Sequence, residues 1–122
     1  MDKITKCIIA ETERLILRRF HKHDLSDLYE YLSDAETVKF EPYRPMTLSE
    51  VISNLDWRIY TPEMIAVEMK NQTKLIGNIY LGNRGNNIKE LGFVFNRKYW
   101  NQGHAKESCQ TIIELEFSKG TN

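Results

Sequence analysis

The sequence has little cysteine and no long apolar run. Its two cysteines, Cys7 and Cys109, lack the spacing of metal ligands and are too few for a disulfide framework. The apolar stretch near the N-terminus is too short for a signal peptide, and no segment approaches the roughly 20 apolar residues that cross a bilayer. We therefore expect a cytoplasmic protein with free thiols, no membrane segment and no bound metal.

The chain also lacks a net charge. Lysine and arginine number 17 together, as do aspartate and glutamate, so the formal net charge is zero and a nucleic acid partner is not expected. Hydrophobic residues make up 41% of the 122 residues and charged residues 28%, which is ordinary for a soluble globular protein. Repeats, low-complexity segments and long linkers are missing as well. Residues 1–122 should therefore form a single domain.

The periodicity of apolar residues in the first half predicts one strand and two helices. Residues 13–20 alternate and predict a strand. Asp24 follows as a candidate N-cap of a helix with apolar residues at i, i+3, i+4 and i+7. Residues 34–46 contain two prolines and indicate an irregular segment. Residues 47–57 begin with a capping-box pattern, Thr-Leu-Ser-Glu, and predict the second helix.

The second half predicts three strands and a final helix. Residues 63–70, 74–81 and 89–95 are apolar-rich, and short polar turns separate them, so they predict an antiparallel meander. A helical stripe follows from Gly103 onward, and it places Cys109 on the apolar side. The order strand, helix, helix, three strands, helix indicates an α+β domain with a mainly antiparallel sheet.

The turn at residues 100–105, Trp-Asn-Gln-Gly-His-Ala, lies between a predicted strand and a predicted helix. The first amides of a helix lack internal partners and the macrodipole is positive there, so such a turn suits an anion. Gly103 would let the backbone approach a diphosphate closely, and Ala105 keeps the start of the helix small. A single glycine at such a place is more often part of an ordinary turn, so this pattern alone does not decide the function.

Four motifs together resemble those of the GNAT N-acetyltransferases, in the branch that includes the ribosomal-protein N-terminal acetyltransferases. Residues 12–18, Thr-Glu-Arg-Leu-Ile-Leu-Arg, resemble the core of the family's first strand. Residues 74–77 resemble its third strand and residues 90–93 the start of its fourth. Residues 100–105 resemble its acetyl-CoA pyrophosphate loop. The four motifs occur in the family's order and span nearly the whole chain. Together they are therefore more specific evidence than any single motif.

Within the loop, the match is close but not complete. Gly103 and Ala105 stand at its last two fixed positions, and Trp100 takes the place of a glutamine or arginine. Asn101 departs from the glycine common at its position, where a less favourable backbone angle would be needed. Asparagine tolerates such an angle better than most residues.

The resemblance implies a fold, a cosubstrate and an activity. The acyl-CoA N-acyltransferase fold would bind acetyl-CoA and transfer its acetyl group to a primary amine, a protein N-terminus or a small amine, by direct attack in a ternary complex. The implied cofactor-binding residues are Phe93, Val94, Phe95, Trp100, Asn101, Gln102, Gly103, His104 and Ala105. The resemblance also places Tyr43 and Trp57 in the helical region that forms the acceptor pocket in this family. They could line that pocket, although packing in the core or at its rim is the more common role.

Glu90, at the head of the strand at residues 89–95, is the candidate general base, directly or through a water. A solvent-exposed glutamate at a strand end is the competing interpretation. Two other sets of residues have simpler interpretations. We expect Arg18 and Arg19 at a solvated strand edge, and we expect His104 to face solvent or a phosphate. Neither His21 nor His23 has the partners that a metal site needs.

The chain ends where family members continue with further strands and a helix, so we expect a fold that lacks its C-terminal part. Three explanations stay open: a fragment, a truncated paralogue, or completion of the sheet by a second chain. The general acid cannot be assigned to any residue here. An exposed strand edge at residues 91–95 would favour self-association. The alternative function is an inactive CoA-binding or assembly module.

Overall fold

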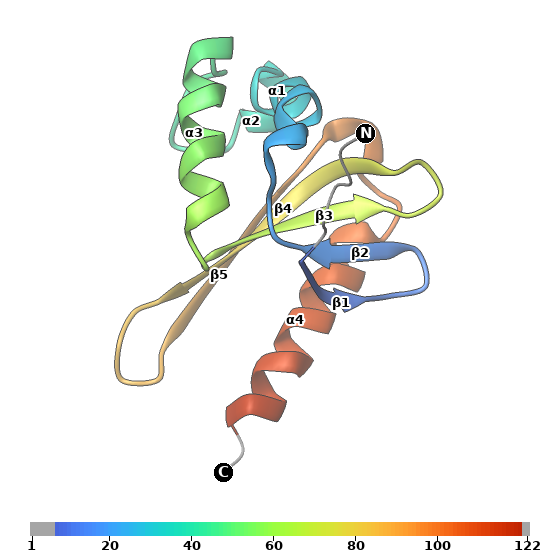
Figure 1. Ribbon diagram of the computed structural model, residues 1–122, viewed down its shortest axis with the longest axis vertical. Coiled ribbons are helices and arrows are strands. Elements are labelled where there is room, and N and C mark those ends of the chain that lie inside the picture. Colours follow the sequence, from blue (N-terminus) through green and yellow to red (C-terminus); the bar gives the residue numbers. More distant parts are fainter. Residues whose placement is uncertain (1–6, 121–122) are drawn as a thin grey trace.

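Five strands form one antiparallel sheet in the computed structural model, which describes residues 7–120 (Figure 1). The strands lie side by side in sequence order. They are β1 (Ile8–Glu11), β2 (Leu15–Arg18), β3 (Met64–Met69), β4 (Lys74–Asn83) and β5 (Lys89–Phe95). The predicted strand and meander are therefore confirmed. β1, which the sequence pattern did not indicate, is a four-residue edge strand paired with β2.

Helices cover both faces of this sheet (Figure 1). They are α1 (Leu25–Leu32), α2 (Ala35–Val38), α3 (Leu48–Tyr60) and α4 (His104–Gly120), with short 3-10 turns η1 (Lys22–Asp24) and η2 (Arg97–Tyr99). The first three pack on one face, and α4 packs on the other. The α+β class is confirmed.

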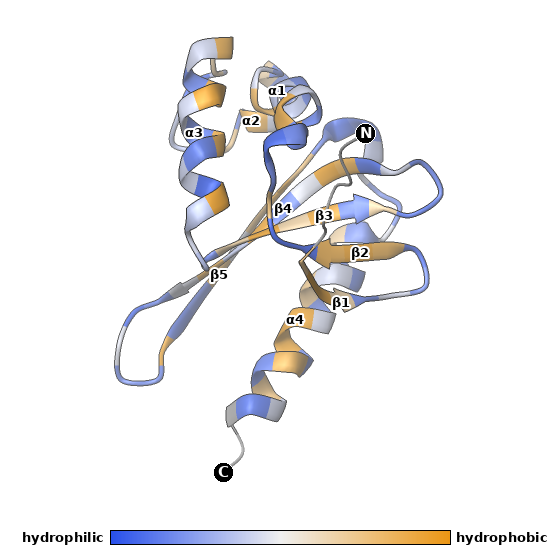
Figure 2. Ribbon diagram, viewed as in Figure 1, coloured by the Kyte–Doolittle hydropathy of each residue, from blue (hydrophilic) through white to orange (hydrophobic). Residues whose placement is uncertain are grey.

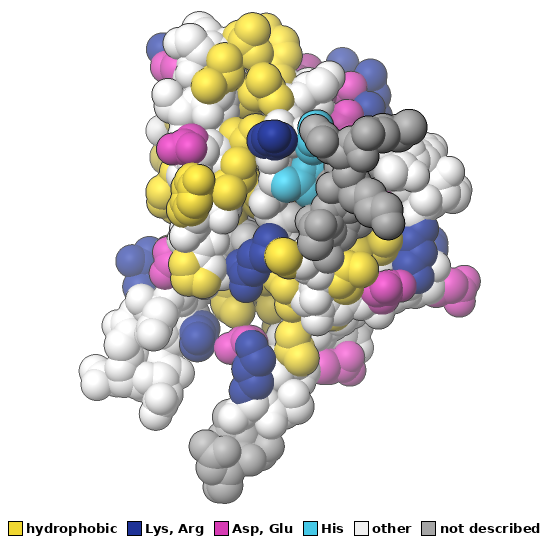
Figure 3. Space-filling model, viewed as in Figure 1, with side chains coloured by type: hydrophobic (Ala, Val, Ile, Leu, Met, Phe, Trp, Pro, Cys, Tyr) yellow, Lys and Arg dark blue, Asp and Glu magenta, His cyan; other side chains and the backbone are white. Residues whose placement is uncertain are grey.

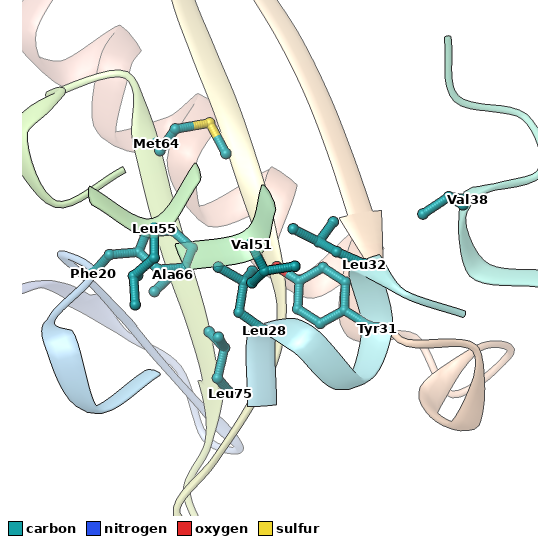
Figure 4. Packing of buried hydrophobic residues seen from close by; sticks show 10 residues of the cluster. All are labelled: Phe20, Leu28, Tyr31, Leu32, Val38, Val51, Leu55, Met64, Ala66 and Leu75. Atoms are coloured by element: carbon teal, nitrogen blue, oxygen red, sulfur yellow. The ribbon is translucent and has the colours of Figure 1, made fainter. Parts of the chain in front are cut away.

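The core is divided between the two faces of the sheet. Figure 4 shows the first cluster, in which Leu28 and Tyr31 of α1 and Val51 of α3 pack over the sheet. The second cluster joins β2, which is apolar along most of its length (Figure 2), to Ile112 of α4. β3 is buried on both faces because its side chains alternate between the two clusters. The domain therefore has no solvated sheet face at its centre.

Thr47 and Asp24 both stand at the predicted N-cap positions, but only Thr47 caps its helix with its side chain. The Thr47 side chain accepts from the Glu50 amide at 3.3 Å, and the Glu50 carboxylate accepts from the Thr47 amide at 2.9 Å. The side chain of Asp24 makes no cap bond to α1. It accepts instead from the amide of His21 at 2.9 Å and from the guanidinium of Arg18.

Arg18 is buried, so the prediction of a solvated strand edge is wrong for this residue. Its Nη2 lies 2.9 Å from Asp24 Oδ1 and its Nε 2.8 Å from Glu68 Oε1. Burial alone would lower the pKa of Arg18, but the bonds to the two carboxylates raise it overall. The physical reason is that both faces of β2 are covered, and a buried charge needs partners. Arg19 reaches the rim, where its Nη1 donates to the carbonyl of Pro62 at 2.8 Å.

The β4–β5 hairpin and the C-terminal half of α4 project from the same end of the molecule (Figures 1 and 3). Lys89 Nζ and Glu116 Oε1 connect the two arms at 3.5 Å. The predicted apolar stripe of α4 packs over the first half of the helix only, because Ile112 is buried whereas Phe117 is 71% exposed. This end of the domain therefore carries apolar surface that the described residues leave uncovered.

Candidate active site

A cavity of about 340 Å³ lies between α2, β5 and the start of α4. The residues that line it include most of those that the sequence predicted for cofactor binding: Phe93, Val94, Phe95, Trp100, Asn101, Gly103, His104 and Ala105. Gln102 belongs to the same loop but does not line the cavity. The fold thus brings the end of a strand and the start of a helix together around one space.

Backbone amides gather at the start of α4. Asn101 and Gly103 both have positive φ, 63° and 84°, which turns the chain sharply before the helix. The first bond of the helix is donated by the amide of Glu107 to the carbonyl of Gly103 at 3.0 Å. The amides of residues 104–106 therefore precede the hydrogen-bond ladder and have no acceptor within the helix. Together with the positive end of the macrodipole they form an arrangement that suits an anion.

Two side chains fix this loop. The indole of Trp100 donates to the carbonyl of Phe95 at 2.7 Å, which ties the loop to the end of β5. Arg14, just before β2, donates from Nη1 to the carbonyl of Gln102 at 3.0 Å and from Nε to Glu107 Oε1 at 2.8 Å. The sequence motif contained Arg14 but gave it no role in the site. Its role appears only when β2 and α4 lie next to each other in the fold.

His104 is the first residue of α4 and is only 2% exposed. Its Nδ1 lies 3.2 Å from the carbonyl of Tyr99, and the two rings meet edge to face with centroids 6.2 Å apart. The expectation that His104 faces solvent is therefore wrong. The side chain packs under the loop and helps hold the start of the helix in place, while part of it borders the cavity.

Glu90 lies on β5 opposite Gly82, and its carboxylate is held by Arg84 in an exposed ion pair. The Nε of Arg84 donates to Glu90 Oε1 at 2.7 Å. Glu90 is not among the residues that line the cavity formed by the described chain. Its catalytic role stays a prediction, and the base would have to reach the amine from outside this cavity.

The opposite wall of the cavity comes from α2 and the turn after it, which the sequence had suggested was irregular. Thr37, Phe40 and Glu41 line it. Thr37 Oγ1 accepts from the amide of Arg97 at 3.2 Å, and Arg97 Nε donates to Asp34 Oδ2 at 2.7 Å, so α2 is anchored to the end of β5. The Asp-x-x-Thr cap of α2 was the available signal in the sequence, since the Asp34 side chain accepts from the Thr37 amide at 3.2 Å.

A second, open groove of about 650 Å³ lies between residues 43–46 and α3. Tyr43 and Trp57 both line it, so the fold brings together two residues for which packing and an acceptor pocket were both considered. Burial and the negative charge of Glu41 both raise the pKa of Tyr43. The two cavities thus lie next to one shared chain segment.

Other reactive groups contribute little. Burial raises the pKa of Cys109, which makes it a poor nucleophile. Within residues 7–120, no group of three or more histidine, cysteine, aspartate or glutamate side chains is arranged to hold a metal ion. None of the helices described for this chain is long and apolar enough to cross a membrane.

This combination of a five-stranded antiparallel sheet, flanking helices and an amide-rich loop at the start of α4 defines the acyl-CoA N-acyltransferase fold. The chain belongs to the GNAT family of acetyltransferases, because the family model described as "Acetyltransferase (GNAT) domain" matches residues 14–120. The fold and family that the four sequence motifs implied are therefore confirmed.

Individual relatives agree with this assignment. The chain is 32% identical over 110 residues to YnaD of Bacillus subtilis (strain 168), an uncharacterized N-acetyltransferase, and the match covers 88% of this chain and 65% of YnaD. The crystal structure of a GNAT-family acetyltransferase from Bacillus anthracis superposes with a TM-score of 0.84 at 28% identity, covering 89% of this chain and 66% of that one. A GCN5-related N-acetyltransferase from Brucella melitensis shares the fold, with a TM-score of 0.76, 16% identity, and coverage of 96% and 56%. The chain thus spans about two thirds of the length of the first two relatives.

Proposed function

We propose that this domain transfers an acetyl group from acetyl-CoA to a primary amine by direct attack in a ternary complex. The observation that carries the proposal is the single cavity that joins the unpaired amides of residues 104–106 to β5. The free thiols Cys7 and Cys109 fit a reducing cytoplasm.

In this proposal the diphosphate lies against the loop at residues 100–105 and accepts from the amides of residues 104–106, and the pantetheine arm follows residues 93–95. β5 is the last strand of the described sheet, so its outer edge offers backbone groups to an extended ligand, in the manner of strand addition. A backbone N–H of this segment would polarise the thioester carbonyl and stabilise the developing oxyanion. Gln102 would contribute its backbone N–H only, since its side-chain amide donates to the carbonyl of Lys98 and its own carbonyl accepts from Arg14.

The acceptor is a primary amine, and the branch resemblance favours a protein N-terminus over a small amine. The groove lined by Tyr43 and Trp57 would contact the acceptor beyond its amine. Glu90 is the sequence-derived base. To act, it would take the amine's proton directly or through a water while remaining paired with Arg84.

The test is a calorimetric titration of acetyl-CoA into the 122-residue chain and into two tryptophan variants. Gly103→Trp places an indole in the proposed diphosphate site and should abolish binding. Gly85→Trp is the matched control, because Gly85 also has positive φ, 82°, but lies in the β4–β5 turn with open space around it. Equal binding by both variants would disprove the proposed site.

The second candidate is a CoA-binding or assembly module without turnover. It is favoured by the uncovered apolar edge of β5, where Leu91 and Phe93 are exposed. In this case CoA should raise the thermal stability, because a ligand that binds only the native state stabilises it, while no amine is acetylated. We also propose self-association through that edge, which sedimentation measurements at several protein concentrations would test.

A further inference from the structure

We propose that Glu41 is the carboxylate that binds the acceptor's ammonium group and accepts its proton. The inference rests on the proposed acetyl transfer and assigns a catalytic residue that the sequence motifs did not suggest. It starts from the residues that line the cavity beside β5, because Glu41 is the only carboxylate among them.

The charges in this cavity are separated between its two walls. The amide-rich loop, the positive end of α4 and Lys106 lie on one side, and they suit the diphosphate. Glu41 and Phe40 lie on the other side, facing the cavity together with Phe93 and Val94 of β5. The thioester would lie along β5, so an amine held by Glu41 would lie next to the carbonyl that it attacks.

The position of Glu41 is fixed by the fold. The amide of Glu41 donates to the carbonyl of Val38 at 2.9 Å, and Val38 is buried in the core. Asp34 and Thr37, at the start of the same helix, bind Arg97 just after β5. The turn that carries Glu41 is therefore attached at one end to the strand that would hold the cofactor. A base on a rigid support is well placed for proton transfer.

The carboxylate of Glu41 is also available. It is half-buried, and it has no ion-pair or hydrogen-bond partner among residues 7–120. Its charge is nevertheless felt inside the domain, because it contributes to the raised pKa of Tyr43 after burial. Glu90 differs in each respect, since it is exposed, paired with Arg84 and outside the cavity.

The surroundings of Glu41 suit an organic ammonium ion. Phe40 and Phe93 both line the cavity and are 86% and 53% exposed. Lys39 Nζ already lies 5.2 Å from the centroid of the Phe40 ring, so Phe93 is the ring that offers an aromatic face to a ligand cation. Aromatic faces attract cations and also cover apolar carbon, so an amine with an attached hydrocarbon group would gain from both. The expected ligand is therefore a primary ammonium group on an apolar or aromatic carbon chain.

In the chemical step, Glu41 takes one proton from the ammonium and leaves a neutral amine. The nitrogen lone pair attacks the thioester carbon, a C–N bond forms, and collapse of the tetrahedral intermediate breaks the C–S bond. The CoA thiolate leaves with the bonding electrons. The second proton released by nitrogen passes to the thiolate, and Glu41 releases the first proton to solvent, so the products are the amide, CoA and one proton.

Benzylammonium is a suitable probe, and Trp100 is the reporter because it lines this cavity. Trp57 lines the other groove and is the only other tryptophan, so all variants carry Trp57→Phe. Benzylammonium should change the Trp100 emission, and Glu41→Gln should weaken its binding by at least about tenfold, as expected for loss of a charge-assisted contact. Benzyl alcohol, which lacks the charge, should bind both proteins equally weakly.

Glu36→Gln is the matched control. Glu36 lies on α2, just before the turn that carries Glu41, but it is exposed and paired with Lys39, so its loss should leave benzylammonium binding unchanged. Absence of benzylammonium binding to the parent, or equal binding by the parent and Glu41→Gln, would overturn the assignment. Circular dichroism and thermal unfolding establish that each variant is folded.

Turnover separates this inference from the proposed function. With acetyl-CoA and benzylamine, Glu41→Gln should lower kcat by about 10²- to 10⁴-fold, remove the acid limb of the pH profile, and leave acetyl-CoA affinity unchanged. If Glu90→Gln rather than Glu41→Gln has this effect, Glu41 is not the base. If the parent binds no acetyl-CoA at all, the proposed function fails, whereas the benzylammonium titration still decides whether Glu41 holds an ammonium.

Discussion

Replacement of Arg18 by methionine tests how much the buried ion pairs contribute to stability. The guanidinium holds Asp24 and Glu68, and all three side chains are only 3% exposed. Methionine fills a similar volume but removes the guanidinium that bonds both carboxylates. Removing one partner of a buried ion pair costs about 3–5 kcal/mol, which is a large part of the total of about 5–15 kcal/mol for a small domain.

Arg14→Met is the matched control. Arg14 also binds a carboxylate, with Nη2 at 2.6 Å from Glu107 Oε1, but the two side chains are 42% and 24% exposed. Exposed pairs contribute about 0–1 kcal/mol, so this variant should lose far less stability. The two substitutions are chemically identical, and they differ in burial.

Urea unfolding followed by circular dichroism measures both effects. With a slope of about 1.5 kcal/mol per molar urea, Arg18→Met should lower the midpoint by about 2–3 M and Arg14→Met by less than about 1 M. Arg18→Lys keeps the charge but cannot reach both carboxylates in the same way, so its midpoint should lie between those of the parent and Arg18→Met. Midpoints that fall equally for Arg18→Met and Arg14→Met would refute the argument from burial.

Three further predictions concern the site and its support. Gly77→Ala should destabilise the domain by about 1–3 kcal/mol in urea unfolding, because a Cβ there would lie 2.6 Å from Cδ1 of Phe95. Trp100→Phe removes the bond to the Phe95 carbonyl, so acetyl-CoA affinity measured by calorimetry should fall about three- to tenfold, as expected for one hydrogen bond. Desolvation alone would raise the pKa of Glu107, but bonds from Thr12 and Arg14 lower it below its usual 4.5. The pKa of Glu107 is lower in the folded than in the unfolded chain, so its ionised form stabilises the fold. The stability difference between the parent and Glu107→Gln should therefore be complete at neutral pH and disappear as the pH falls below about 4.5. A difference that grows on acidification would contradict this.

The elements that sequence could predict are those whose signals are local. The meander at β3, β4 and β5 follows from apolar runs separated by polar turns, and the cap of α3 from Thr47 and Glu50. The sharp turn at residues 100–105 was also predicted, including a less favourable backbone angle at Asn101, whose φ is 63°. These features depend on residues that are neighbours along the chain.

The errors concern contacts between distant segments. Arg18 looked solvated because its sequence neighbours include Arg19 and polar residues, yet its partner Glu68 is 50 positions away and α1 covers that face. α2 was missed because a four-residue helix has no usable periodicity. Glu41 was missed for a different reason, because only the packing of α2 beside β5 brings its side chain to the cavity.

The contact between Arg14 and the carbonyl of Gln102 joins segments that are 88 positions apart. A ligand that immobilises the loop would therefore also restrain the start of β2, and thermodynamic linkage requires that loosening β2 weakens the ligand to the same extent. Acetyl-CoA should then slow amide hydrogen exchange in β1 and β2, which lie outside the cavity, as well as in α4. The N-terminal hairpin would behave as a remote part of the cofactor site, so substitutions there would alter affinity without touching the ligand.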